Sequence, residues 1–452
     1  MVLAAGIIPV AGALLAKILV VYRRGPVDPW RSTYQSHLTS FARYSNHEVY
    51  YLNVARPATP KSLMAIDFDA VIFHYTFVAW RVDPEDFEEH LKRIEFLKDT
   101  TCPKALIPHD EHVHADYLCQ VVRDYGVTHV FTPAAPSEWR KIYRETDFEA
   151  LQFTRVLTGY IDDESVAKTV ARAKQPHARP IDVGYRSWDT YPYFGRHGLL
   201  KGQIGTLFAE KAPLAGLTTD ISSNPKDAFY GDSWFDFLLK CRYTIGVEGG
   251  TSVLDFDGEI ATRTKKYMRT HPGASFEEIE AACFPGLDGQ FNYFLLGPRH
   301  LEAVMTGTCQ VLIEGDYGGA LEPGKHYIAL KRDFSNIDEV LELMKDEEER
   351  VRMVERAYAD VIESGKWTFE AFAKDVLGQL LGGRPTAGLQ SPMGSLRVAH
   401  NRLDEALWLP RSKVKPMLIR LLHATKNATR PIAVQVLGED RVRETLKFLR
   451  GR

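Results

Sequence analysis

Short β-branched runs and longer amphipathic segments alternate along most of the chain. In the first half, segments with helical periodicity cover residues 33–45, 87–99 and 114–126. Between them, the apolar runs predicted as strands are Ile18–Tyr22, Glu48–Leu52, Ala70–Phe73, Lys104–Ile107 and His129–Phe131. This alternation is typical of a parallel sheet whose two faces are covered by helices.

A second alternating set follows a polar, proline-containing stretch at residues 171–180, which we interpret as a linker. Long helices then run from Ile337 to about Leu381, and residues 382–395 have the composition of a hinge. The strands predicted in this half are Ile181–Tyr185, Gly202–Phe208, Ala215–Thr218, Tyr243–Val247, Gln310–Ile313 and Tyr327–Leu330.

These patterns predict an α/β chain with two doubly wound Rossmann-like domains that face a cleft. The domains are expected at residues 17–175 and 180–381, and a basic helical extension at residues 386–452. In such sheets ligands bind beyond the carboxyl ends of the strands. Residues that directly follow a predicted strand are therefore the first candidates for chemistry.

Composition narrows the class of protein. The chain has 452 residues, of which 45% are hydrophobic and 25% charged, and a formal net charge of -3. These values are typical of a soluble globular enzyme and provide no overall attraction to nucleic acid. The five cysteines are scattered without a C-x-x-C pair, which favours a reducing compartment over a disulfide framework or a zinc site.

The first 16 residues are apolar but have no basic residues before the apolar run. A secretory signal normally carries such residues. We interpret residues 1–16 as a leader or an over-long start, with a signal anchor as the alternative.

Arg299 and Glu302 stand at the start of a short apolar helix that ends at Gly307 and is followed by a β-like run. Three residues apart, they share one face of the first helical turns. The carboxylate can accept two hydrogen bonds from a vicinal diol such as a ribose, and the guanidinium can neutralise phosphate. A capping salt bridge at the surface is the alternative.

Two further groups have the chemistry of a donor site. Lys201 and Arg186 stand near the entry of the second domain and suit a diphosphate, although both can be ordinary surface cations. The stretch "GVEGGTSVLDFDGE" leaves a predicted strand, so its glycines let backbone N–H groups approach an anion. Its candidate residues are Glu248, which we expect to point into the cleft, with Gly249, Gly250 and Thr251. Asp255 and Asp257 can hold a divalent metal, but a chance match is the preferred interpretation.

In the first domain, the strand at 104–107 leads through Pro108 into the sequence His-Asp-Glu-His. Imidazoles and carboxylates at a cleft edge are candidates for a general base. The spacing does not match a zinc protease motif. We select Asp110 as the base, with His109 and Glu111 as alternatives, although either acid can instead cap the next helix.

The stretch from about Gly246 to Lys374 resembles the C-terminal half of bacterial GT-B glycosyltransferases of the CgeB-like kind. The resemblance rests on the R-x-x-E-A helix, the following strand, the pattern G-x-x-Y-I-x-L and the helix-rich end. It implies a hexosyltransferase-type, metal-independent enzyme without a cofactor, whose donor is a nucleotide sugar, with a UDP-sugar favoured over a GDP-sugar. The second domain would bind this donor and the first the acceptor, which can be a glycan, a lipid-linked molecule or a small molecule.

On this resemblance Glu302 holds the donor ribose, and Arg299, Lys201 and Arg186 face the diphosphate. Related retaining enzymes carry Glu-x7-Glu, but Phe294 stands where the first glutamate is expected. Glu248 can replace that glutamate in space, or the mechanism differs, so retention and inversion both stay open. A sugar-nucleotide epimerase and a non-catalytic nucleotide-sugar binding or scaffold protein are the alternative functions.

The extension from Thr386 onward contains thirteen Lys and Arg against five Asp and Glu, which gives about +8, whereas the remainder is about -11. Such a segment can lie on anionic lipid. This predicts a cytoplasmic enzyme, with peripheral attachment to the inner face of the membrane as an option, in the synthesis of bacterial surface glycans. The alternative is that the tail helices pack on the acidic body of the protein.

Overall fold

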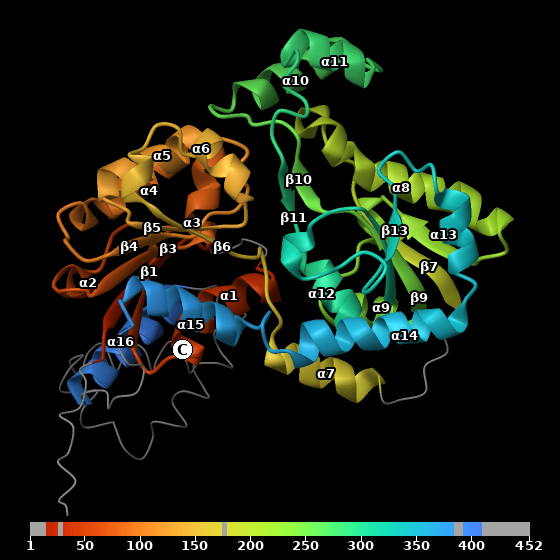
Figure 1. Cartoon of the computed structure of the whole chain (residues 1–452). Helices are drawn as coiled ribbons and strands as arrows, with labels where there is room; N and C mark the ends of the chain where they lie inside the picture. The colour runs from red at the N-terminus through yellow and green to blue at the C-terminus, as the bar shows by residue number, and fades with distance from the viewer. Residues whose placement is uncertain (1–14, 26–29, 174–178, 384–391, 409–452) are drawn as a thin grey trace, which may run out of the picture.

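The computed structural model describes residues 15–25, 30–173, 179–383 and 392–408. Two parallel α/β sheets lie side by side in Figure 1, one in each half of the chain. Each is covered by helices, so the predicted fold class is confirmed: two Rossmann-like domains in the GT-B arrangement. The leader at residues 1–16 lies outside the described residues, except for Leu15 and Ala16, which are buried.

The N-terminal sheet has six parallel strands in the order β2-β1-β3-β4-β5-β6. Its strands are β1 (Lys17–Tyr22), β2 (Glu48–Asn53), β3 (Ala70–Phe73), β4 (Lys104–Leu106), β5 (His129–Thr132) and β6 (Gln152–Arg155). Its helices are α1 (Ser32–Arg43), α2 (Lys61–Met64), α3 (Tyr75–Val78), α4 (Pro84–Arg93), α5 (Ala115–Tyr125) and α6 (Trp139–Ile142). The strand order reverses between β1 and β3, where ligands bind in folds of this kind.

The C-terminal sheet has five parallel strands in the order β13-β12-β9-β7-β8. They are β7 (Ile181–Arg186), β8 (Thr219–Ser222), β9 (Cys241–Gly246), β12 (Cys309–Ile313) and β13 (Ile328–Leu330). The order reverses between β7 and β9. Its helices are α8 (Gly195–Leu214), α9 (Asp232–Leu239), α12 (Pro298–Met305), α13 (Ile337–Leu343) and α14 (Glu347–Ala357), and α7 (Asp163–Ala173) precedes the sheet.

Two predicted strands are wrong. Residues 215–218 form the connection between α8 and β8, which begins at Thr219. Residues 202–208 lie inside the long helix α8. Leu200, Ile204 and Phe208 recur every four residues and are buried against this sheet. That is the spacing of a helical stripe, which the glycines within "GQIGTLF" concealed.

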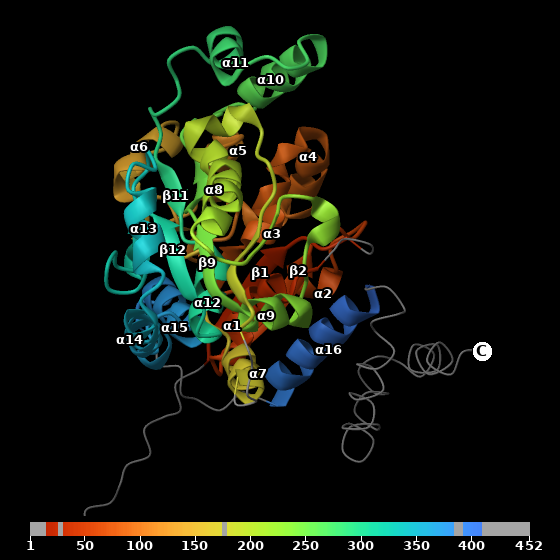
Figure 2. The same cartoon turned by 90° about the vertical axis from the view of Figure 1, so that its right-hand side faces the viewer.

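The chain returns to the N-terminal domain after the second sheet, and its last two described helices pack there. Helix α15 (Phe369–Leu380) falls in the predicted second domain, yet Phe369, Phe372 and Val376 join the core around β1 and α1 of the first. Figure 1 shows it below the N-terminal sheet. Helix α16 (Pro392–Trp408) lies along β2, where Asn401 bonds both backbone groups of Tyr51, accepting from its N–H at 2.8 Å and donating to its carbonyl at 2.9 Å. The edge of the sheet is thereby covered (Figure 2).

The described part of the tail is therefore structural. Glu405 of α16 accepts hydrogen bonds from Tyr22 at 2.7 Å and from Arg56 at 3.0 Å. Eleven of the thirteen basic residues of the extension belong to residues 409–452, which lie outside the described part of the chain. None of the described helices combines the length and the apolar character needed to cross a bilayer.

A strap, defined here as residues 249–295, extends from the C-terminal domain to the N-terminal one. It begins and ends with an antiparallel pair, β10 (Gly249–Thr251) and β11 (Tyr293–Leu295), and carries α10 (Glu259–Thr270) and α11 (Phe276–Cys283) above the two sheets (Figure 1). The backbone of Asp255 pairs with His112 and His114, at 2.7 and 2.9 Å. Phe256 and Phe291 are buried in the core of the N-terminal domain.

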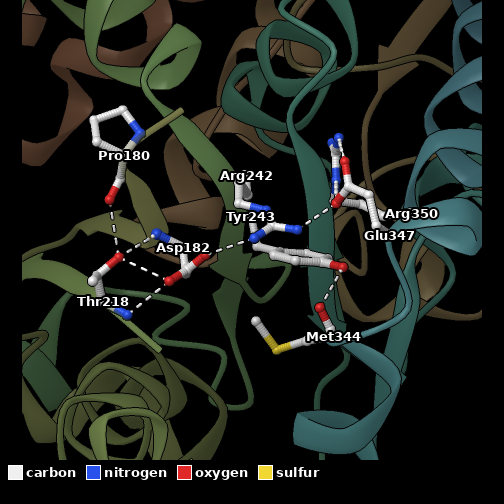
Figure 3. A network of polar contacts seen from close by, with 8 residues as sticks. All are labelled: Pro180, Asp182, Thr218, Arg242, Tyr243, Met344, Glu347 and Arg350. Carbon is white, nitrogen blue, oxygen red and sulfur yellow. Dashed lines mark hydrogen bonds and ion pairs between the residues drawn. The ribbon is translucent and has the colours of Figure 1, made fainter. Parts of the chain in front are cut away.

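The amino ends of β7 and β9 are fixed by a polar network (Figure 3). Arg242 donates to Asp182 at 3.2 Å and to Glu347 of α14, and Asp182 also accepts from Thr218 at 2.8 Å. Hydrogen bonds from Arg350 and Arg242 lower the pKa of Glu347 to about 2. These contacts hold the sheet at one end, so its carboxyl end is the one available for ligands.

Candidate active site

Glu302 lies on α12, next to β12 of the C-terminal sheet. Its Oε2 accepts a hydrogen bond of 2.7 Å from the indole Nε1 of Trp234 on α9. No described residue donates to its Oε1. Burial raises the pKa of Glu302, while Trp234 and the nearby guanidinium groups of Arg299 and Arg31 oppose this rise. The carboxylate is thus held by one bond and keeps one oxygen for a ligand.

Arg299 of the C-terminal domain lies beside this carboxylate, and Lys201 of the same domain lies near Arg299. The guanidinium carbon of Arg299 is 5.9 Å from the Trp234 ring centroid, and its Nη1 donates to the carbonyl of Arg186 at 2.9 Å. Lys201 projects from α8, with its ammonium 5.7 Å from the ring of Trp188. Burial lowers the pKa of Lys201 to about 8, with a further contribution from Arg299, and Asp110 acts in the opposite direction.

The N-terminal domain contributes the carboxylate of Asp110 near Lys201. Asp110 follows β4, is exposed, and has a left-handed backbone with φ of 53°. Arg81, fully buried, donates to the carbonyls of Val78 at 2.9 Å, Val113 at 3.0 Å and Asp110 itself. Because Arg81 joins its own helical turn at Val78 to the loop that contains Asp110 and Val113, the backbone that carries the Asp110 carboxylate is fixed.

These side chains form what we name the interdomain site: Arg31, Asp110, Lys201, Trp234, Arg299 and Glu302. The site draws on both domains. Arg31 of the N-terminal domain lowers the pKa of Glu302, and Asp110 of the same domain raises the pKa of Lys201. Three cations and two carboxylates give a net positive site. Such a site can bind a diphosphate and a diol and presents a carboxylate on the opposite domain.

Arg186 was predicted to face the same diphosphate. In the structure its guanidinium bonds Asp220 Oδ1 at 2.7 Å and the carbonyls of Asp220 at 2.8 Å and Asp227 at 3.0 Å. It also lies over the rings of Phe229 and Phe237. These contacts engage most of its donors, so they favour a structural role, and its carbonyl is what reaches Arg299.

The expected orientation of Glu248 into the cleft is wrong. The side chain is 2% exposed, and its Oε1 accepts from the backbone N–H of Tyr317 at 2.8 Å. Its Oε2 lies so close to Gly315 that a Cβ there would be at 2.2 Å. Burial raises the pKa of Glu248. These contacts favour a structural role for Glu248 in the loop after β12 over replacement of the glutamate expected at position 294. The ring of Phe294 stacks on His197, with ring centroids 3.7 Å apart.

The glycine pair predicted to meet the donor serves the strap instead. Gly249, Gly250 and Thr251 form β10, in register with Leu295, Phe294 and Tyr293. Gly250 has φ of 106°, and a Cβ there would lie 1.8 Å from the carbonyl oxygen of Tyr293. The hydroxyl of Thr251 donates to the carbonyl of Phe194 at 2.9 Å. The pairing of β10 with β11 therefore requires glycine at position 250. The Thr251 hydroxyl is engaged by the backbone.

The two alternatives to Asp110 as base are less suitable. Glu111 is 0% exposed and accepts from Thr132 at 2.5 Å and Tyr143 at 2.6 Å. Burial raises its pKa to about 6. His109 stacks on Tyr75 with ring centroids 3.8 Å apart, and burial lowers its pKa to about 4, which makes it a weak base.

The aspartate pair considered for a metal has helix-capping contacts. Asp255 accepts from the backbone N–H groups of Ile260 at 3.0 Å and Ala261 at 2.8 Å, at the start of α10. Asp257 accepts from Glu259 N at 3.2 Å. Both carboxylates are therefore engaged by the start of the helix that follows them in the strap.

Two members of the interdomain site were not predicted. Trp234 comes from a short apolar helix, and nothing in "DSWFDFLL" marks its indole as a partner of Glu302. Arg31 precedes α1 and reaches the site only because the first helix of the N-terminal domain faces the second domain. Both need tertiary structure to be found.

A cavity of about 360 Å³ lies elsewhere, on another face of α8, with Arg196, His197, Gln203 and Arg332 among its lining residues. None of the six residues of the interdomain site lines it. Arg196 is already paired with Glu277, Glu280 and Asp288, at 3.1, 3.1 and 3.0 Å. The chemistry of the interdomain site is therefore separate from this cavity.

The chain shows little similarity to known proteins in sequence or in structure. No known family model matches the chain, and no curated protein matches it significantly. It resembles the solved structure of Alr3699/HepE of Anabaena with UDP-glucose, at TM-score 0.43 and 12% identity over 81% of this chain and 100% of that one. It also resembles a DNA-modifying β-glucosyltransferase, at TM-score 0.43 and 10% identity over 81% of this chain and 99% of that one. The likeness to TarM has TM-score 0.35 and 13% identity over 69% of this chain and 54% of that one, so this chain spans about half of the TarM chain.

At such identities and scores these likenesses carry no argument about activity. They also give the CgeB-like family no support. The sheet orders and the return of α15 to the first domain are the features that assign this chain to the two-domain GT-B fold class.

Proposed function

We propose that this chain is a glycosyltransferase that moves a sugar from a nucleotide-diphosphate sugar to an acceptor hydroxyl. The observation that carries the proposal is the composition of the interdomain site. On one domain a carboxylate with one unbonded oxygen lies beside Arg299, with Lys201 near Arg299, and the exposed carboxylate of Asp110 acts on Lys201 from the other domain. We expect a UDP-sugar as donor, a hexose as the transferred group and a role in bacterial surface glycan synthesis.

The donor half of the mechanism uses the second domain. Glu302 Oε1 accepts hydrogen bonds from a ribose diol, which fixes the nucleoside. Lys201 and Arg299 offset the charge of the diphosphate, which increases when the bond to the sugar breaks. Fixed positive groups at the place where negative charge develops are an effective way to stabilise a transition state.

The acceptor half uses Asp110. Its carboxylate accepts the proton of the acceptor hydroxyl as that oxygen bonds to the anomeric carbon, and the bond from this carbon to the diphosphate oxygen breaks. The products are the glycosylated acceptor and the nucleoside diphosphate. Phe294 stands where related retaining enzymes carry the first glutamate, and Glu248 already accepts a hydrogen bond from Tyr317. We therefore propose a single displacement that inverts the configuration at the anomeric carbon. NMR of the product tests this, and a retained configuration contradicts it.

Donor affinity is expected to fall as pH rises through about 8. Burial lowers the pKa of Lys201 to about 8, and only its protonated form attracts a diphosphate. Bound diphosphate raises that pKa again, so Kd should increase about tenfold per pH unit between the free and bound values. Calorimetric titration with UDP from about pH 7 to about pH 10 measures this. Lys201→Arg should show a flat profile, and a flat wild-type profile would remove Lys201 from the diphosphate.

Turnover is expected to survive EDTA. Two cationic side chains provide the positive charge, and Asp255 and Asp257 accept bonds from the backbone of α10. The measurement is nucleotide release with EDTA and after addition of Mg²⁺ or Mn²⁺. Asp257→Asn, in which the capping oxygen is kept, is the matched variant and should bind donor as the wild type does. An absolute metal requirement would contradict the expectation.

The proposed function is tested by incubating the full chain with UDP-, GDP-, dTDP- and CMP-sugars, with and without a panel of glycan acceptors. Release of nucleotide that depends on an acceptor supports glycosyl transfer. Interconversion of the sugar nucleotide without an acceptor would indicate an epimerase. Donor binding without turnover on any acceptor would indicate a binding or scaffold protein.

A further inference from the structure

Four aromatic rings form a continuous run in the loop between β7 and α8. Trp188 lies 6.2 Å from Phe194, Phe194 lies 5.0 Å from Tyr193, and Tyr193 lies 5.3 Å from Tyr191, measured between ring centroids. Trp188 is 46% exposed and Tyr191 is 47% exposed. Core packing does not require this exposure, and neighbouring exposed aromatic rings mark interaction surfaces.

The run connects the proposed donor site with both the acceptor domain and the strap. At one end the Trp188 ring is 5.7 Å from the ammonium of Lys201. In its middle Phe194 contacts His112 of the N-terminal domain, with ring centroids 5.2 Å apart. Near its other end the ammonium of Lys265 on α10 lies 5.5 Å from the Tyr193 ring. A molecule lying along the rings would therefore have one end at the interdomain site and the other at α10.

Helix α10 adds positive charge at that far end. Lys265 and Arg269 are four residues apart, so they share one helical face, and both are exposed. Neither has an ion pair with another residue of the described part of the chain. Arg263 is also exposed but points away from that face, so it provides a control.

We propose that the rings of Trp188, Tyr193 and Tyr191, continued by Lys265 and Arg269, bind an extended acidic glycan as the acceptor of the reaction. This rests on the proposed function, because it places the acceptor next to Lys201. Trp and Tyr rings have an apolar face that covers the C–H face of a sugar and a polar edge that stays in water. The unpaired cations suit the carboxylate, phosphate or sulfate groups of an acidic chain. The run of rings leads to the interdomain site, where the proposed reaction needs an acceptor hydroxyl, and the several hydroxyls on each unit of a glycan favour a glycan over a nucleic acid as the occupant.

The test is affinity electrophoresis of the full chain through gels that contain polygalacturonate, alginate or neutral dextran. The acidic polysaccharides should retard the wild type more than dextran does, and added salt should reduce this difference. Trp188→Ala and Tyr191→Ala should each weaken retardation about tenfold, the size of one lost aromatic contact. Lys265→Ala with Arg269→Ala should abolish the preference for acidic chains, whereas Arg263→Ala should keep it.

The inference is overturned if no polysaccharide retards the wild type, if the variants behave as their controls, or if a single-stranded oligonucleotide binds more tightly than the acidic polysaccharides. The same proteins are titrated with UDP-sugars to separate this inference from the proposed function. Donor binding without polysaccharide binding would contradict this inference and leave the proposed function unaffected. Polysaccharide binding without any nucleotide binding would contradict the proposed function and still support a glycan-binding site at these rings.

Discussion

Asp110→Asn is expected to lower turnover by about 10²- to 10⁴-fold, the range associated with loss of a general base, while donor affinity changes little. The carboxylate is exposed and its backbone is fixed by Arg81. Asparagine tolerates the left-handed φ of 53° at this position, so the exchange removes the base without changing the chain path. The measurement is the rate of nucleotide release at saturating donor and acceptor.

Asp99→Asn is the matched control, since Asp99 is an exposed aspartate before β4, whereas Asp110 follows that strand. It should retain the wild-type rate. If Asp110→Asn also keeps near-full activity, the base lies elsewhere or the displacement requires none from this loop. A loss of donor binding in Asp110→Asn would instead show that the carboxylate positions the nucleotide.

Glu302→Ala is expected to abolish measurable donor binding and leave the fold intact. Each hydrogen bond from the ribose to the carboxylate contributes about 1.5–3 kcal/mol, so loss of two weakens binding by several orders of magnitude. Within the described residues the side chain makes one hydrogen bond, to the partly buried Trp234, so little stability depends on it. Calorimetry with UDP measures the binding, and thermal denaturation reports on the fold.

Glu339→Ala on α13 is the corresponding control, because Glu339 is exposed. Its nucleotide affinity and Tm should equal those of the wild type. Unchanged affinity in Glu302→Ala would remove Glu302 from the donor site. A large fall in Tm would mean that the carboxylate is structural, and Glu302→Gln would then separate charge from packing.

The periodicity of the sequence predicted five of the six strands of the N-terminal sheet and four of the five strands of the C-terminal sheet, because buried parallel strands are short β-branched runs with helices between them. It failed where local and tertiary signals conflict. Residues 202–208 contain two glycines within a helix, so they look strand-like in isolation. Gly250 looks like a ligand-binding glycine, but a neighbouring strand makes a Cβ impossible there.

The candidate site was predictable only in part. Charge spacing identified Arg299 and Glu302, and position after a strand identified Asp110. Whether a carboxylate is free or already bonded depends on residues far away in the chain. Glu111 is engaged by Thr132 and Tyr143, and Glu248 by Tyr317, and no local pattern shows this. Burial and hydrogen-bond partners therefore separate the chemical candidates from the structural ones.

The most direct test of the account is a crystal structure of the full chain with UDP. The account predicts the ribose hydroxyls on Glu302 and the diphosphate between Lys201 and Arg299, within reach of Asp110 across the interdomain site. The contradicting result is UDP bound elsewhere, for example in the cavity lined by Arg196 and Arg332, with Glu302 still bonded only to Trp234.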